Sequence, residues 1–258
     1  MKFKRALITG AADRLGRAMA LALADQGIDI AVHYNGSEAK ARATCDDIAS
    51  RGARAVALQA DLRSKSATRE LVASASDKLG GPLDILINNA SAFEYDTIED
   101  ASDENWDLHM QANFQAAFIL TQDFSKQAPK ASGDLGSRIA NAAIINMLDQ
   151  RIRKLTPAFM TYSLSKHGVW AMTQTTAQAL APDIRVNAIG PGPTIRATRQ
   201  SDAHFNHQRA NTILERGSDP EDIVEAMLYL LSAKSVTGQL ICVDGGQHLG
   251  WRTPDIQN

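Results

Sequence analysis

Short apolar runs alternate with longer amphipathic stretches along most of the chain. Short runs that are rich in Ala, Val, Ile and Leu are typical of buried strands, and stretches with a period near 3.6 residues are typical of helices. The pattern predicts strands at 6–8, 28–34, 53–59, 83–87, within 138–147, and at 184–189 and 239–243. It predicts helices at about 15–26, 37–51, 65–79, 104–126, 158–180 and 220–231.

Strands that alternate regularly with helices are typical of parallel βαβ units. Right-handed crossovers would then place helices on both faces of the sheet. We therefore predict an α/β fold with one Rossmann-type, doubly wound, parallel sheet of seven strands. Residues 1–258 are expected to form a single catalytic domain.

Two segments between the predicted elements look irregular, at about 127–137 and 190–217. A loop as long as the second is usually functional in a compact domain, and we expect it to form a lid over the site. The tail at 247–258 follows the last predicted strand and could pack against a neighbouring subunit.

Composition excludes several classes of protein. With a formal net charge of -2, the chain has no electrostatic signature of nucleic-acid or anionic-membrane binding. The chain contains no run of 18 apolar residues, so no membrane span is predicted. The N-terminal stretch loosely resembles a secretory signal, but Asp13 and Arg14 interrupt its apolar run, so a signal peptide is not predicted. Two cysteines, Cys45 and Cys242, indicate reduced thiols in a cytoplasmic, reducing compartment, and no Cys/His spacing indicates a metal site.

A glycine-containing turn joins the first predicted strand to the first predicted helix. It reads Thr-Gly-Ala-Ala-Asp-Arg-Leu-Gly over residues 9–16. Gly10 allows a tight turn, Gly16 allows helix and strand to approach closely, and the helix N-terminus would face a pyrophosphate. Because Arg14 stands where the generic pattern has a middle glycine, an ordinary strand-to-helix turn stays an alternative at this point.

The end of the second predicted strand favours NADPH over NADH. A carboxylate there would bind the ribose 2′-hydroxyl, but the strand ends without one, and Asn35 and Ser37 can donate hydrogen bonds to a 2′-phosphate. Arg14 on the adjacent loop could reach the phosphate or the substrate, whereas Asp13 counts against NADP. After the third strand, Asp61 could accept from the adenine amino group or simply cap the following helix.

In their order and placement, these residues resemble the short-chain dehydrogenase/reductases over nearly the whole chain. The resemblance rests on Thr9-Gly10-(x)3-Arg14-x-Gly16, Asp61-Leu62, Asn88-Asn89-Ala90-Ser91, Asn113, Tyr162-(x)3-Lys166, Pro191-Gly192 and Val243-Asp244-Gly245-Gly246. It implies an NADP(H)-dependent oxidoreductase that assembles as a homotetramer. The cofactor residues it implies are Gly10, Arg14, Leu15, Gly16, Asn35, Ser37, Asp61, Leu62, Asn89, Ala90, Ser91, Tyr162, Lys166, Pro191, Gly192 and Thr194.

Tyr162 and Lys166 are the expected chemical centre. Residues four apart lie on one face of a helix, and an ammonium beside a phenol would lower the pKa of Tyr162 toward neutrality. Tyr162 could then transfer a proton while the nicotinamide transfers a hydride. The resemblance further implies that Lys166 binds the nicotinamide ribose and that Asn113 holds a water of the proton relay.

One departure from the family narrows the substrate. Most members carry a serine thirteen residues before the tyrosine, and this chain has Asp149 there. A carboxylate repels a carbonyl oxygen but suits a substrate with N–H donors. At position 149, and in the form of its first turn, the chain resembles pteridine and dihydromonapterin reductases. This resemblance implies that Phe93 stacks on a pterin. It also implies that Arg14, Asp149 and Tyr162 contact the pterin.

The prediction is therefore NADPH-dependent reduction of a dihydropterin. The alternatives are a carbonyl or 3-oxoacyl reductase of the same family, and a non-catalytic dinucleotide-binding sensor. The intact Tyr162/Lys166 pair argues against the sensor.

Overall fold

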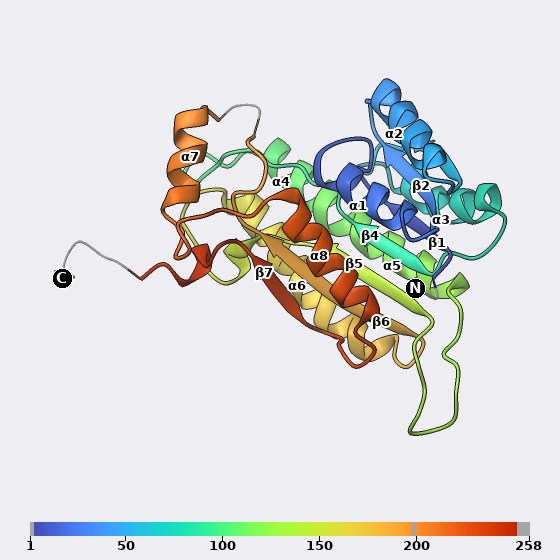
Figure 1. Cartoon of the computed structure of the whole chain (residues 1–258). Coiled ribbons are helices and arrows are strands. Elements are labelled where there is room, and N and C mark those ends of the chain that lie inside the picture. Colours follow the sequence, from blue (N-terminus) through green and yellow to red (C-terminus); the bar gives the residue numbers. More distant parts are fainter. Residues whose placement is uncertain (1–2, 198–199, 252–258) are drawn as a thin grey trace.

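A seven-stranded parallel sheet forms the centre of the molecule (Figure 1). The computed structural model describes residues 3–197 and 200–251. In that part of the chain the strand order is β3-β2-β1-β4-β5-β6-β7, and every pairing is parallel. The strands are β1 (Arg5–Ile8), β2 (Asp29–Tyr34), β3 (Ala55–Gln59), β4 (Ile85–Asn88), β5 (Ala142–Met147), β6 (Ile184–Pro191) and β7 (Leu240–Val243).

Helices cover both faces of this sheet. On one face α1 (Arg14–Ala24), α2 (Glu38–Ser50) and α8 (Pro220–Ser232) pack into a common core. On the other face lie α3 (Lys65–Leu79), α5 (Ala116–Gln127) and α6 (Met160–Ala179). Because both faces are covered, the central strands are apolar at nearly every position rather than at alternate ones. The predicted fold class is confirmed.

Local chemistry sets several helix boundaries. The Asp13 carboxylate accepts from the backbone N–H of Arg14 where α1 begins, and the Ser64 hydroxyl accepts from Ala67 N where α3 begins. Helix α8 begins with Pro220 behind a capping box formed by Asp219 and Asp222. These signals explain why the predicted helix boundaries differ little from the observed ones.

The predicted helix at 104–126 is continuous but not uniform. It consists of α4 (Asp103–His109), the π-helical segment η1 (Met110–Gln115) and α5. A π-helical insertion widens one turn of the helix, and such insertions are frequent at functional sites. The hydrophobic period does not reveal it, because a single wide turn is too short to establish a period of its own.

The expectation of an irregular segment at 190–217 is wrong for its central part. Helix α7 (Asp202–Ala210) forms there, and the Ser201 hydroxyl caps it by accepting from His204 N. Its amphipathic signal is weak because none of its residues is buried. Beyond β7, the short helix η3 (Gln247–Leu249) begins the expected tail, and residues 252–258 of that tail lie outside the described part of the chain.

The order of the strands places a crevice at the carboxyl ends of β1 and β4. The chain runs from β1 to β3 in one direction and from β4 to β7 in the other. At such a switch point the loops above two neighbouring strands diverge, which leaves room for a ligand.

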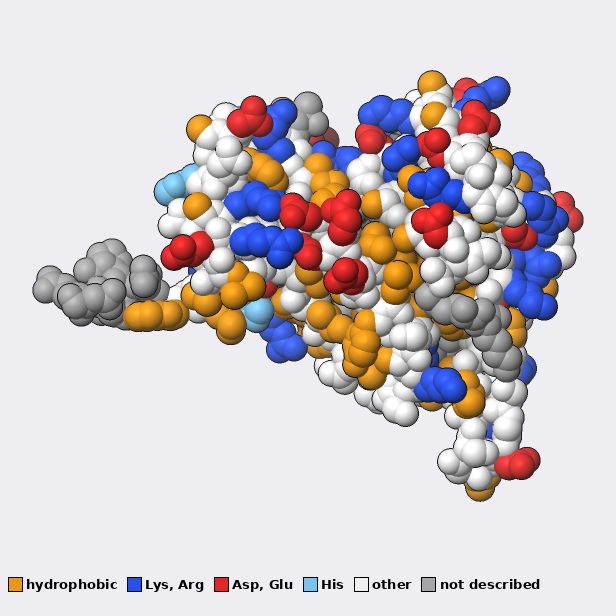
Figure 2. All heavy atoms as spheres, in the orientation of Figure 1, with side chains coloured by type: hydrophobic (Ala, Val, Ile, Leu, Met, Phe, Trp, Pro, Cys, Tyr) orange, Lys and Arg blue, Asp and Glu red, His pale blue; other side chains and the backbone are white. Residues whose placement is uncertain are grey.

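Basic and acidic side chains are interspersed on the face of the molecule that Figure 2 shows. Among the described residues, none of the helices is both long and apolar enough to span a membrane.

Candidate active site

The turn between β1 and α1 is tightly packed around its two glycines. Gly10 has a φ of +64°, a conformation that favours glycine. A Cβ on Gly16 would lie 2.1 Å from the Gly10 carbonyl oxygen and 2.6 Å from the Asn89 amide nitrogen. The turn therefore cannot accept a side chain at residue 16. This close approach fits the role that the sequence assigns to both glycines.

A buried histidine that the sequence analysis did not select fixes this turn. The backbone N–H of Gly10 donates to Nδ1 of His33 at 3.1 Å, so Nε2 of His33 carries the proton and donates to the Ala60 carbonyl at 3.1 Å. The side chain is 1% exposed. Burial lowers the pKa of His33 from 6.5 to about 4, so the ring is neutral at pH 7. The sequence signal that could have selected His33 is its place at the end of β2, next to the first turn.

The loop after β4 is bonded to the same turn. The Asn89 side chain donates to the carbonyls of Thr9 and Gly10 at 2.8 and 3.2 Å. The Thr9 hydroxyl accepts from the backbone N–H groups of Asn89 and Ala90, both at 2.9 Å. Asn89 thus holds the loop after β4 against the turn between β1 and α1.

The crevice is a cleft of about 450 Å³ that extends from the first turn to α6. Its described lining includes most of the predicted residues: Gly10, Arg14, Leu15, Gly16, Asn89, Ala90, Ser91, Phe93, Asp149, Tyr162, Lys166, Pro191, Gly192 and Thr194. The narrow turn at one end and titratable groups at the other fit a dinucleotide whose pyrophosphate lies on the turn and whose nicotinamide lies near α6.

Tyr162 and Lys166 lie on the first turns of α6, and both are almost fully buried. The Tyr162 hydroxyl donates to Oδ2 of Asp149 at 3.0 Å, and Nζ of Lys166 donates to the Met147 carbonyl at 2.8 Å. Asp149 follows β5 and caps the short helix η2 (Gln150–Ile152). The structure thus brings Asp149, Tyr162 and Lys166 together at one end of the cleft.

The expected pKa of Tyr162 is wrong in direction. Burial, and then the neighbouring Asp149 carboxylate, raise the pKa of Tyr162 well above its ordinary value of 10. The Lys166 ammonium lies 5.7 Å from the centre of the tyrosine ring rather than at the hydroxyl, and burial lowers its own pKa from 10.5 to about 8. In this arrangement Tyr162 is a protonated donor at neutral pH.

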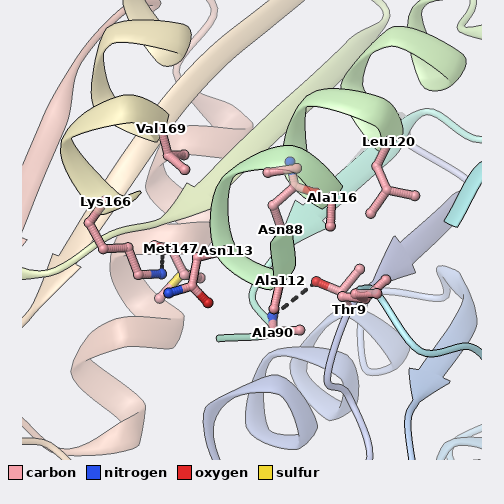
Figure 3. A pocket seen from close by; sticks show the side chains of 12 residues that line it. Thr9, Asn88, Ala90, Ala112, Asn113, Ala116, Leu120, Met147, Lys166 and Val169 are labelled. Atoms are coloured by element: carbon pink, nitrogen blue, oxygen red, sulfur yellow. Dashed lines mark hydrogen bonds between the residues drawn. The ribbon is translucent and has the colours of Figure 1, made fainter. Parts of the chain in front are cut away.

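Asn113 lies in η1, where it holds the loop after β4. Its Oδ1 accepts from Ala92 N at 2.7 Å, and its Nδ2 donates to the Ala92 carbonyl at 3.0 Å and to the Ser165 hydroxyl at 3.1 Å. Figure 3 shows Asn113 and Lys166 side by side at a small cavity of about 10 Å³ behind the cleft. Leu62, which was predicted to contact the cofactor, lines this cavity instead.

An aromatic wall closes the cleft beside Asp149. Phe93 stacks on Phe159 with ring centres 4.4 Å apart and an interplanar angle of 6°, and it meets Tyr162 edge-on at 4.7 Å. The Arg151 guanidinium lies over both phenylalanine rings and pairs with Asp149 at 3.2 Å. Sequence analysis selected Phe93 but missed Phe159 and Arg151, which the loop from 150 to 159 brings to the site.

Arg14 bridges the first turn and the segment at 190–217. Its guanidinium donates to the carbonyls of Ile195 and Arg196, both at 3.0 Å. On the same side of the cleft, Gly192 packs so closely on Asp244 that an added Cβ would lie 2.6 Å from its Cβ. The Thr194 hydroxyl donates to the Gly192 carbonyl at 3.1 Å. Predicted residues from both ends of the chain thus meet at this point.

Besides Leu62 and Asn113, three predicted residues lie outside the cleft lining. Asn35 and Ser37 are exposed beyond β2, and the Asp61 carboxylate is held by the Arg63 guanidinium at 2.6 to 3.0 Å. The structure instead places Lys40, which sequence analysis did not select, against Asp13 on the cleft wall with Nζ and Oδ2 2.5 Å apart. This ion pair offsets the carboxylate that counted against NADP.

Comparison with known proteins identifies the family. Residues 10–248 match the family described as enoyl-(acyl carrier protein) reductase. The 3-oxoacyl-[acyl-carrier-protein] reductase FabG of Staphylococcus epidermidis is 31% identical over an alignment of 251 residues, and the match covers 95% of this chain and 99% of that protein.

Solved structures extend the comparison. FolM alternative dihydrofolate reductase 1 from Brucella suis, in complex with NADP, is 39% identical with a TM-score of 0.91 and covers 99% of both chains. The same-named protein from Brucella canis, also with NADP, is 39% identical with a TM-score of 0.90 and covers 98% of this chain and 97% of its own. A short-chain dehydrogenase from Burkholderia cenocepacia with NADP is 28% identical with a TM-score of 0.86 over 95% of this chain and 97% of its own.

The fold, the Tyr–Lys pair and these matches define an oxidoreductase. The chain belongs to the short-chain dehydrogenase/reductase family. The predicted cofactor, NADP(H), agrees with the cofactor held by these solved structures.

Proposed function

We propose that this protein uses NADPH to reduce a dihydropterin to a tetrahydropterin. The observation that carries the proposal is the carboxylate of Asp149, which accepts from the Tyr162 hydroxyl at 3.0 Å inside the cleft. Where most family members present a neutral serine to a carbonyl oxygen, this site presents a negative charge. The similarity to two proteins named alternative dihydrofolate reductase supports the same substrate class.

The chemistry of a C=N reduction fits the described groups. NADPH supplies the hydride to the carbon when it is bound, and the adjacent nitrogen needs a proton. The raised pKa of Tyr162 keeps its hydroxyl protonated, so it can donate to that nitrogen either directly or through Asp149. The exposed side of the Phe93 ring lines the cleft and can stack on a flat heterocycle.

A carbonyl or 3-oxoacyl reductase is the competing candidate, and similarity to FabG supports it. The two candidates separate in one assay. Purified protein is mixed with NADPH and one test substrate, and loss of the nicotinamide absorbance is followed. The pterin substrates are dihydrobiopterin, dihydrofolate and dihydromonapterin, and the competing substrate is a 3-oxoacyl thioester. Turnover of the thioester without turnover of any pterin would refute the proposal.

The variant Asp149→Ser makes the same distinction within the protein. It replaces the carboxylate by the residue that most family members carry. We expect pterin turnover to fall by about 10- to 100-fold, the value of a charge-assisted hydrogen bond, and ketone turnover to rise. Unchanged pterin turnover in this variant would show that Asp149 does not select the substrate.

We further propose a homotetramer in the cytoplasm, with the segment at 190–217 as a lid. Large apolar side chains support the association: Trp106, Phe118 and Leu164 are each 45–48% exposed on α4, α5 and α6. Light scattering coupled to gel filtration measures the oligomer directly.

A further inference from the structure

We propose that Arg151 is a positioning residue that holds the Asp149 carboxylate charged and aimed into the cleft while it fixes the Phe93 ring beside it. This inference deepens the proposed function and rests on it for the substrate. Arg151 lies on η2, two residues after Asp149, and its side chain is 20% exposed. It connects the charged element of the site with the aromatic one.

Arg151 binds Asp149 through both its backbone and its side chain. The backbone N–H donates to Oδ1 at 2.8 Å, and Nη1 lies 3.3 Å from Oδ1 and 3.2 Å from Oδ2. The backbone bond fixes the direction of the carboxylate, and the guanidinium supplies the opposite charge. Because Asp149 is only 14% exposed, water can offset little of its charge, and Arg151 is the cation paired with it in the described structure.

The rest of the guanidinium is used for stacking rather than for hydrogen bonds. Its central carbon lies 4.8 Å from the centre of the Phe159 ring and 5.7 Å from that of Phe93. Its Nε is buried and finds no hydrogen-bond partner among the described residues. A flat cation over two stacked rings restricts how those rings can tilt. The face that Phe93 offers to a substrate ring is therefore set by Arg151.

Two properties of Arg151 thus act separately, its charge and its flat shape. Lysine keeps the charge but lacks the planar face, and methionine keeps most of the length but lacks the charge. The matched control is Arg153→Met, because Arg153 lies in the same loop and over an aromatic ring, that of Trp170 at 6.0 Å. The described ion pairs do not join Arg153 to Asp149.

Kinetics with NADPH and a dihydropterin test both properties. We expect Arg151→Met to raise KM for the pterin about tenfold or more while the NADPH dissociation constant, measured by fluorescence, stays within about twofold. It should also move the acid limb of the kcat/KM profile to higher pH by about one unit or more, because the counter-charge of Asp149 is lost. Arg151→Lys should restore the acid limb but not KM.

Other charged and titratable groups also act on Asp149, and they are the same in every variant. Those that face it from the packed elements are Tyr162 and Lys166 on α6 and Cys242 on β7. A shift that appears in Arg151→Met and not in Arg153→Met therefore reports on Arg151. An acid limb that stays at the wild-type pH in Arg151→Met, or equal effects of the two methionine variants, would overturn the proposal.

A second measurement does not depend on the substrate. The fall in Tm caused by Arg151→Met is measured in the wild-type background and in an Asp149→Asn background. We expect a larger fall in the wild-type background at pH 7, because an asparagine at position 149 carries no charge for Arg151 to pair with. If no pterin is turned over but this coupling is present, the proposed function fails and the Arg151–Asp149 pairing stands. Equal falls in the two backgrounds would refute the pairing itself.

Discussion

His33 provides a quantitative test of how the first turn is held. We predict that His33→Gln removes a large part of the acid sensitivity of this protein. The neutral ring accepts from Gly10 N and donates to the Ala60 carbonyl, and it is almost completely buried. A glutamine amide can accept and donate at the same two groups, but it does not titrate between pH 4 and 8.

The size of the effect follows from the pKa shift. His33 has a pKa of about 4 in the folded protein and 6.5 as its ordinary value. The unfolded chain therefore binds more protons between these values, so stability falls as pH falls from about 7 toward 4. At 1.36 kcal/mol per unit, the full loss is about 3 kcal/mol, of which about 2 kcal/mol is already lost at pH 5.

Urea denaturation at pH 8, 7, 6 and 5 measures this directly. The wild-type free energy of unfolding should fall by about 2 kcal/mol more than that of His33→Gln between pH 8 and 5. His204→Gln is the control, because His204 is exposed on α7 and should follow the wild-type curve. Parallel curves for the wild type and His33→Gln would refute the reasoning.

Three further predictions concern the cofactor end and the proton donor. Gly16→Ala should abolish NADPH binding or folding, because its Cβ would lie 2.1 Å from the Gly10 carbonyl oxygen; cofactor-induced thermal shift and circular dichroism distinguish the two results. Lys40→Met should weaken binding of 2′,5′-ADP about tenfold and leave 5′-AMP unchanged in calorimetry, because it exposes the Asp13 charge to the 2′-phosphate. Lys166→Met should lower kcat by about 100-fold or more with the fold intact, and a kcat near that of the wild type would exclude Lys166 from the proton path.

The chain pattern predicts the architecture well because periodicity reports burial. Strands with apolar residues at every position require a sheet covered on both faces, and cap residues such as Asp13 and Ser64 mark where helices begin. The helix α7 escapes this reasoning because it buries none of its side chains. The π-helical turn that holds Asn113 escapes it because hydrogen-bond register leaves little trace in composition.

The sequence alone determines which chemistry is present: glycines at the first turn, Tyr162 and Lys166 four residues apart, and Asp149 in place of serine. Only the tertiary structure decides how these groups act on one another. Burial and the Asp149 carboxylate raise the pKa of Tyr162, although spacing to Lys166 predicts the opposite. The physical reason is that a pKa depends on solvent exposure and on distances between atoms, and helix spacing fixes neither. Arg151 shows the same principle, since its contact with Asp149 and two rings exists only after the loop has folded.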